Sequence, residues 1–284
     1  LPHVKLRSIQ MKNKLTLFPF LLCCITGLNA QTSISTTPGN SVEFSAFGDS
    51  ATGSLGNVPS THFTFTAWIK PNGTQADLAG IFITEADTAV GLSVVGSNNE
   101  LAYHWPGGQI YWPHGLRVEP NKWSYVAMII TPDSAVLSVN EDVSSHVIEL
   151  DTTVLGKFKL GAYQNWIARQ FKGELDEVKI WNRALTLDEV RERRHFTLLQ
   201  GDLSDNTLLA YYQFNTTDMG MVRNLVNQDT LGVYNGASLI ESDVAVGTGN
   251  FDRVNISSPG TYVLGNTKTK ISFGANTAQG TIVV

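Results

Sequence analysis

Residues 63–69 read FTFTAWI, a run in which large apolar side chains alternate with small polar ones. In a β-strand, successive side chains point to opposite faces. One face therefore carries Phe63, Phe65, Ala67 and Ile69, and the other carries Thr64, Thr66 and Lys70. This alternation predicts a half-buried strand, and it sets the pattern by which the rest of the chain can be interpreted.

Residues 123–130, WSYVAMII, are apolar at nearly every position, which predicts a central strand covered on both faces. Further short alternating runs follow at intervals of about ten residues, separated by turn residues, as in all-β proteins. One segment, 186–194, indicates a short surface helix, because Thr186 and Glu189 have the spacing of a capping box. A single helix excludes a parallel α/β fold, so the pattern predicts a β-sandwich.

The composition describes a globular protein that is unsuited to nucleic acid. Only 16% of the residues are charged, against about a quarter in an average domain, which argues against disorder. The 20 basic residues face 25 acidic ones, a formal net charge of −5, so the chain lacks the basic surface that binds phosphate backbones.

Residues 11–30 carry the pattern of an export signal: lysines at 12 and 14, a short apolar run, and small residues up to Ala30. The run is too short for a membrane-spanning helix, and no later segment is long and apolar enough to span. Residues 1–10 precede the expected start at Met11, and 31–40 form a flexible lead-in. We therefore expect a secreted or cell-surface protein. Cleavage after Ala30 would remove both cysteines, Cys23 and Cys24, and lipid attachment at one of them is the alternative.

Three blocks resemble a known family. They read FTAWIKP at 65–71, NKWSYVA at 121–127 and GELDEVKIWNRAL at 173–185. In this order they resemble the laminin G-like branch of the concanavalin A-like lectin/glucanase superfamily. The resemblance implies an all-β jelly-roll sandwich of two antiparallel sheets with one short surface helix, in a domain spanning residues 41–200.

The remainder of the chain allows two interpretations. Residues 201–248 contain a strand and turn pattern that either packs on the sandwich or opens a second repeat. Residues 249–284 resemble a small, incomplete β-module, and the apolar ending TIVV at 281–284 indicates that the natural chain continues beyond Val284.

Motifs for catalysis are scarce. The sequence lacks the metalloprotease, serine-hydrolase and phosphate-loop motifs. Hydrolases that share the resembled fold place carboxylates on one strand in the order Glu-x-Asp-x-x-Glu. Here Glu174 and Asp176 begin that order, but Lys179 occupies the last position, so the pair of carboxyls that a glycosidase needs is incomplete. We therefore expect a non-catalytic protein, with a glycoside hydrolase or polysaccharide lyase of atypical site as the alternative.

Asp176 is the candidate metal ligand. Simple alternation puts it on the face of Val178 and Ile180, which would bury a carboxylate and require a compensating partner. The resemblance implies one structural Ca²⁺ held by Asp176 and the opening loop near Asp49. The alternative is that Asp176 accepts backbone N–H groups or pairs with Arg183.

An aromatic cluster at 103–114, YHWPGGQIYWPH, is the candidate ligand site. Indole and phenol rings can stack on the C–H face of a sugar, and neighbouring imidazoles and amides can bind its hydroxyls. The predicted ligand-binding residues are Trp105, Tyr111, Trp112, His104, His114 and Gln109. The alternative is that Tyr103 and Trp105 fill the core. Zinc at the two histidines lacks further ligands at a suitable spacing.

The other tryptophans at 123, 166 and 181 are expected to fill the sandwich. We expect an exported recognition module that binds a glycan or an extracellular protein, with a structural spacer of a surface adhesin as a further alternative.

Overall fold

The computed structural model describes residues 39–86, 89–106, 115–149, 152–164, 166–215, 217–218, 221–244 and 246, together with four short strands between 254 and 282. The predicted export signal at 11–30 lies outside the described residues. Within them, no helix combines the length and apolarity that a membrane crossing requires.

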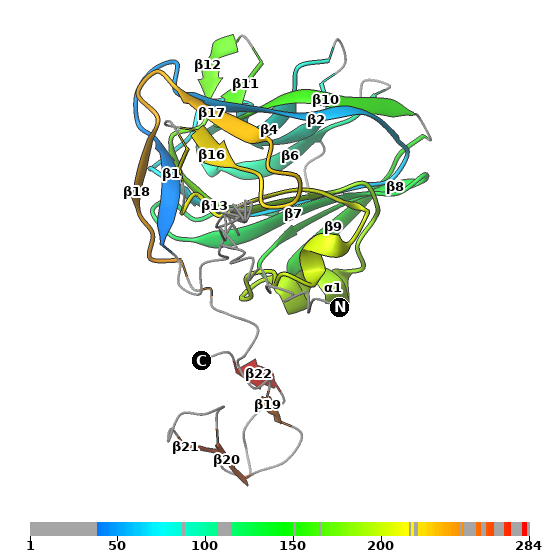
Figure 1. Ribbon diagram of the computed structural model, residues 1–284, viewed down its shortest axis with the longest axis vertical. Helices are drawn as coiled ribbons and strands as arrows, with labels where there is room; N and C mark the ends of the chain where they lie inside the picture. Colours follow the sequence, from blue (N-terminus) through cyan, green and yellow to red (C-terminus); the bar gives the residue numbers. More distant parts are fainter. Residues whose placement is uncertain are drawn as a thin grey trace, which may run out of the picture. The chain divides into compact units, whose positions relative to one another are not determined.

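Two stacked sheets make up the main body (Figure 1). Sheet A runs in the order β18-β1-β13-β3-β7-β8-β9, and β14 pairs with the second half of β13. All its described pairings are antiparallel. Its strands are β18 (Ser238–Glu241), β1 (Asn40–Phe44), β13 (Gly173–Trp181), β3 (Phe63–Pro71), β7 (Ser124–Ile130), β8 (Ser134–Val139), β9 (Asp142–Val147) and β14 (Leu208–Tyr212).

Sheet B runs in the order β11-β12-β4-β10-β2-β17-β16-β15, and β5 joins β4 to β6. Its pairings are antiparallel apart from one parallel pair, Gln170 with Gly80, where β12 meets β4. Its strands are β11 (Ala162–Tyr163), β12 (Trp166–Gln170), β4 (Ala79–Thr84), β10 (Thr153–Leu160), β2 (Ser50–Ser60), β17 (Thr230–Tyr234), β16 (Met221–Arg223), β15 (Thr217–Asp218), β5 (Gly91–Val95) and β6 (Glu100–His104).

The main core lies between the sheets. Phenylalanines from both layers stack there: Phe65 of β3 lies 4.9 Å from Phe82 of β4, which lies 5.3 Å from Phe158 of β10, centroid to centroid. Burying such rings between two antiparallel sheets is the packing of a jelly-roll sandwich, so the expected fold class is confirmed.

A second apolar cluster covers the outer face of sheet A, where helix α1 (Leu187–Arg193) packs. Trp68, Trp181 and Val190 belong to it. The capping box forms as predicted, since the Thr186 side chain accepts from the Glu189 N–H and Glu189 accepts from the Thr186 N–H. Because of this cover, strand β3 is buried on both faces, and the expectation that it is half-buried was wrong. Strand β7 is central, as its sequence predicted.

A β-bulge in β13 overturns the face expected for Asp176. Asp176 pairs with Trp68 and Lys179 with Thr66, so β13 has one extra residue, and Glu177 adopts a left-handed φ of 52°. The extra residue reverses the alternation. Asp176 therefore faces outward with Lys179, whereas Val178 faces the inner core.

The strands after residue 201 pair with both sheets: β14 with β13, β17 with β2, and β18 with β1. Two short 3₁₀ segments, Gly96–Asn98 and Asp202–Ser204, lie in connections. Farther along, β19 (Val254–Ile256) pairs with β22 (Gly280–Ile282), and β20 (Gly260–Val263) pairs with β21 (Lys270–Phe273).

Candidate functional site

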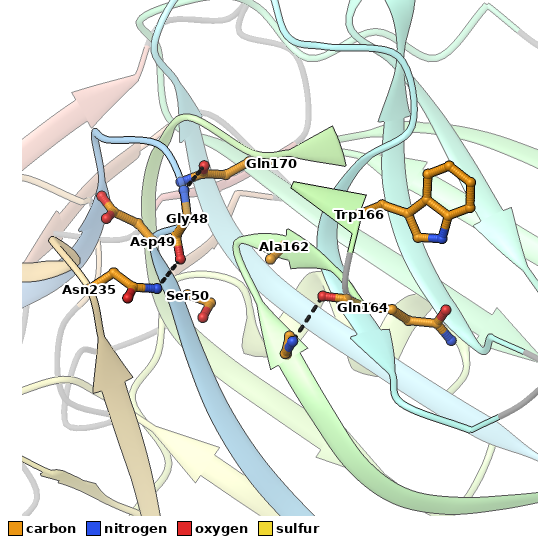
Figure 2. Close-up of a pocket in the computed structure, with 9 residues that line it drawn as sticks. Gly48, Asp49, Ser50, Ala162, Gln164, Trp166, Gln170 and Asn235 are labelled. Carbon is orange, nitrogen blue, oxygen red and sulfur yellow. Dashed lines mark hydrogen bonds between the residues drawn. The ribbon is translucent and has the colours of Figure 1, made fainter. Parts of the chain in front are cut away.

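A hollow of about 350 Å³ opens beside sheet B, within the range of small-ligand pockets. Figure 2 shows the opening loop and Asn235 on one side, Gln164 and Trp166 on the other, and Ser50 and Ala162 between them. The lining comes from the turn after β1, the start of β2, the end of β10, the β11–β12 hairpin and the turn after β17. It consists of Gly48, Asp49, Ser50, Lys159, Ala162, Gln164, Trp166, Gln170 and Asn235.

Asp49 holds the opening loop in shape. Its Oδ2 accepts from the backbone N–H of Ser45 at 3.0 Å and of Ala46 at 2.7 Å, and its Oδ1 accepts from the N–H of Gly236 at 2.7 Å. Three such bonds satisfy a buried carboxylate and join the loop to the turn after β17.

Two amide side chains fix Gly48 at the rim. The Gly48 N–H donates to Oε1 of Gln170 at 2.7 Å, and its carbonyl accepts from Nδ2 of Asn235. The φ of 92° at Gly48 is in the left-handed region, which favours glycine. This wall of the hollow is therefore pre-organised by the chain itself.

The opposite wall is the β11–β12 hairpin. Gln164, with φ 46°, donates from Nε2 to the carbonyls of Thr84 at 3.2 Å and Ala86 at 2.9 Å, and its own carbonyl accepts from Nζ of Lys159 at 2.9 Å. Lys159 also pairs with Glu85 at 3.2 Å. The hairpin is thus bound to sheet B through both the backbone carbonyl and the side-chain amide of Gln164.

Trp166 is presented to solvent by this hairpin, with 59% of its surface exposed. The expectation that it fills the sandwich was wrong. Two other aromatic residues beside the lining are also exposed, Phe47 by 73% and Tyr234 by 54%. Of these three rings, Trp166 lines the hollow, and its exposed indole makes the hollow a candidate binding surface. The Gly48-Asp49 pair, a combination typical of turns, is the sequence signal that could have identified the loop next to Phe47.

The cluster predicted as the ligand site is only partly described. His104 and Trp105 are each 2% exposed, and Trp105 belongs with Tyr103 to the inner core, so neither ring offers a free face to a sugar. Ring packing explains this, since the His104 imidazole lies edge-on to Tyr163 at 4.9 Å and its Nε2 lies 2.9 Å from Ser93 Oγ. The other predicted residues, Gln109, Tyr111, Trp112 and His114, lie outside the described residues.

The side-chain oxygens of the two residues expected to hold calcium accept hydrogen bonds from the protein itself. The oxygens of Asp49 are directed at three N–H donors, as described above. Those of Asp176 accept from the Glu177 N–H at 2.7 Å and from the Ser242 hydroxyl at 2.7 Å. Calcium needs six to eight oxygen ligands, and among the described residues no group of three or more acidic, histidine or cysteine side chains could hold a metal. Asp176 caps a backbone N–H, while Arg183 pairs with Glu189 at 2.8 Å.

The carboxylates of β13 are engaged in a buried network on the outer face of sheet A. Glu177 Oε2 accepts from Lys179 Nζ and from the Tyr211 hydroxyl, both at 2.7 Å. Burial, and next the charge of Glu177, raises the pKa of Asp176 well above its ordinary value. Glu174 instead pairs with Lys70 at 3.1 Å. Of the residues that line the hollow, Asp49 is the acidic one.

Comparison with known proteins identifies the fold independently. A laminin G model described as the concanavalin A-like lectin/glucanases superfamily matches residues 44–191. No curated protein matches the chain.

Two solved structures share the architecture. One is a Bacteroides ovatus protein named a "putative carbohydrate binding protein", with a TM-score of 0.58 and 18% identity over 75% of this chain. The match spans 62% of that protein's length. The other is a pentraxin of Limulus polyphemus, with a TM-score of 0.53, 13% identity, and coverage of 74% of this chain and 99% of that one. At these identities the likeness concerns the fold.

Proposed function

Because the chain belongs to the concanavalin A-like lectin/glucanases superfamily, we propose that it is a recognition module that binds carbohydrate in the hollow beside Trp166 without transforming it. The superfamily supplies the scaffold, and the function is argued from the site, since one fold serves many functions.

The observation that carries the proposal is the exposed indole of Trp166, which lines a hollow whose walls are held by hydrogen bonds. A sugar ring has an apolar C–H face that packs on indole and hydroxyls that need hydrogen-bond partners. The lining offers such partners in the Ser50 hydroxyl and the side-chain carbonyl oxygens of Gln164 and Asn235. Since the loop and hairpin are already fixed, binding costs little ordering of the protein.

Two further considerations support this ligand class. The Bacteroides ovatus protein that shares the fold is named for carbohydrate binding. The export signal expected at 11–30 would deliver the module outside the cell, where glycans and extracellular proteins are the available partners. Since Asp49 and Asp176 are committed to N–H and hydroxyl donors, we propose that binding does not require calcium.

The test is a glycan array probed with the whole chain, followed by titration calorimetry with each soluble glycan that binds. Trp166→Ala should weaken binding at least tenfold, or about 1.4 kcal/mol, because truncating an exposed aromatic anchor removes its stacking area. Trp123→Ala is the matched control. That indole lies on the outer side of sheet A, where it contacts Lys70 and Asp243, and its loss should leave affinity unchanged.

An array without any bound glycan, or equal affinity for Trp166→Ala and the unchanged chain, would refute the proposal. Adding a chelator should not alter the affinity. Release of new reducing ends from a bound glycan would instead favour the hydrolase alternative.

A further inference from the structure

Arg169 lies between two aromatic rings at the base of the β11–β12 hairpin. Its guanidinium carbon is 4.9 Å from the centroid of the Tyr163 ring and 4.8 Å from that of Trp166. Both distances fall within the range of about 6 Å over which a cation is attracted to a ring face. The two rings therefore hold a half-buried cation in one place beside the exposed indole.

Among the described residues, Arg169 lacks the carboxylate partner that several other arginines have. Arg183, Arg191 and Arg194 each pair with a carboxylate of Glu189 or Glu141. In the described part of the chain, Arg169 has neither an ion pair nor a hydrogen-bond acceptor, and its contacts are those with the two rings.

The geometry leaves the hydrogen-bonding capacity of Arg169 available. Stacking uses the faces of the planar guanidinium, whereas its five N–H donors lie along the edge. Two neighbouring N–H donors of a guanidinium match the two oxygens of a carboxylate. Charge-assisted bidentate pairs of this kind are among the strongest hydrogen bonds in proteins. A side chain already held by stacking loses little further freedom when such a pair forms.

We infer that the ligand of this site is an acidic sugar, whose carboxylate binds the guanidinium edge of Arg169 while the ring of the same or the adjoining sugar stacks on Trp166. The inference deepens the proposed carbohydrate binding and rests on it. A uronic acid presents both required features, a flat carboxylate and a pyranose ring.

Arg169 lies next to the lining residue Trp166, and the two basic groups nearest to it are neutral or already paired. Burial, with a smaller effect from Arg169, lowers the pKa of His104 to about 4, so that imidazole is neutral at pH 7. Lys159 is engaged with Glu85 and the Gln164 carbonyl.

The net charge of −5 repels a dense polyanion at long range, but salt screens such repulsion beyond about 8–10 Å. A short acidic oligosaccharide in direct contact with Arg169 avoids most of it.

The experiment uses the whole chain on an array that carries uronic-acid, sialylated, sulfated and neutral glycans, with methyl-esterified copies of the carboxylated ones. Bound glycans should be carboxylated, and methyl esterification should reduce their affinity about tenfold or more, because it removes the charge and one acceptor. Pentaglutamate serves as an acidic probe without a sugar ring.

Variants of Arg169 separate ligand contact from ring positioning. Arg169→Met keeps the apolar stem but removes the guanidinium, and it should reduce affinity for acidic glycans about tenfold, with little change for their methyl esters. Arg169→Lys keeps the positive charge but lacks the paired N–H donors of a guanidinium. Its affinity for acidic glycans should lie between those of the unchanged chain and Arg169→Met. Arg191→Met on helix α1 removes one positive charge from the opposite sheet, and it should leave affinity unchanged.

Three results would overturn the inference while leaving carbohydrate binding at Trp166 intact. In the first, neutral or sulfated glycans bind as tightly as carboxylated ones. In the second, the methyl esters bind as tightly as the free acids. In the third, Arg169→Met loses the same affinity for the acids as for the esters. The last would show that Arg169 only positions Trp166. Pentaglutamate binding more tightly than any glycan would refute both proposals.

Discussion

Glu177 and Asp176 show how single residues control the outer face of sheet A. The left-handed φ of 52° at Glu177 creates the bulge that turns Asp176 outward, where Ser242 donates to it at 2.7 Å. Burial, reinforced by the neighbouring charge of Glu177, raises the pKa of Asp176, so its neutral form is favoured in the folded protein.

The pH dependence of Asp176 follows from that direction. Because the folded pKa is raised above the unfolded value of 3.8, the unfolded state binds fewer protons once the pH exceeds that value. The free energy of unfolding should therefore fall as the pH rises above about 3.8. We expect Asp176→Asn, which cannot ionise, to remove this part of the dependence and to be at least as stable as the unchanged chain at pH 7.

Urea unfolding of both proteins at a series of pH values measures the difference. Asp176→Ala is the control for the lost hydrogen bonds, and it should be less stable than Asp176→Asn at every pH. A stability difference between Asp176→Asn and the unchanged chain that does not vary with pH would contradict this account.

Among the elements, α1 depends on its first turn. Arg183 donates to both oxygens of Glu189, at 2.8 and 3.0 Å, and this pair is the main reason that the pKa of Glu189 is lowered to about 2. The carboxylate also accepts from the Thr186 N–H at 2.9 Å. One side chain thus connects the helix start to the end of β13.

We expect protonation of the Glu189 carboxylate to lower the stability of the protein in acid. Its folded pKa lies below the unfolded value of 4.5, so the stabilisation is present above that value and is lost as the pH falls towards about 2. Partial exposure of the pair limits the effect. Glu189→Gln should flatten the curve of unfolding free energy between pH 4.5 and 2, as measured by thermal melting. Thr186→Ala, which removes only the cap, should cost about 1 kcal/mol at all pH values. Equal acid sensitivity of Glu189→Gln and the unchanged chain would be the contrary result.

How far the sequence predicts these elements depends on how local their causes are. The capping box of α1 and the apolar strand at 123–130 are set by neighbouring residues, and both formed as predicted. The bulge at Glu177 could not be predicted, because alternation assumes an unbroken register and an extra residue depends on pairing with β3. The exposure of Trp166 likewise depends on hydrogen bonds from Gln164 to residues about eighty positions earlier.

At the scale of the whole molecule, the sandwich needs strands from outside the region that matches the family. That match ends at residue 191, yet β14, β17 and β18 pair with β13, β2 and β1. The turn after β17 also supplies Asn235 to the hollow and the Gly236 N–H to Asp49. Both the fold and the candidate site are therefore assembled from distant parts of the sequence.

A shortened chain tests this dependence. Residues 39–246 should unfold in one cooperative thermal transition, whereas residues 39–200 should show none, because five strands, β14 to β18, and their share of both apolar clusters are missing. Circular dichroism during heating distinguishes the two. A cooperative transition for residues 39–200 would show that the later strands are dispensable.

The indole N–H signals of the six tryptophans give the most direct test of the central claim, that a glycan stacks on Trp166. In a two-dimensional ¹⁵N–¹H spectrum, the signal absent from Trp166→Phe identifies that residue. On titration with a soluble glycan found on the array, we expect this signal to shift while those of the buried Trp68 and Trp181 stay in place. A saturating glycan that leaves the Trp166 signal unmoved would contradict the account.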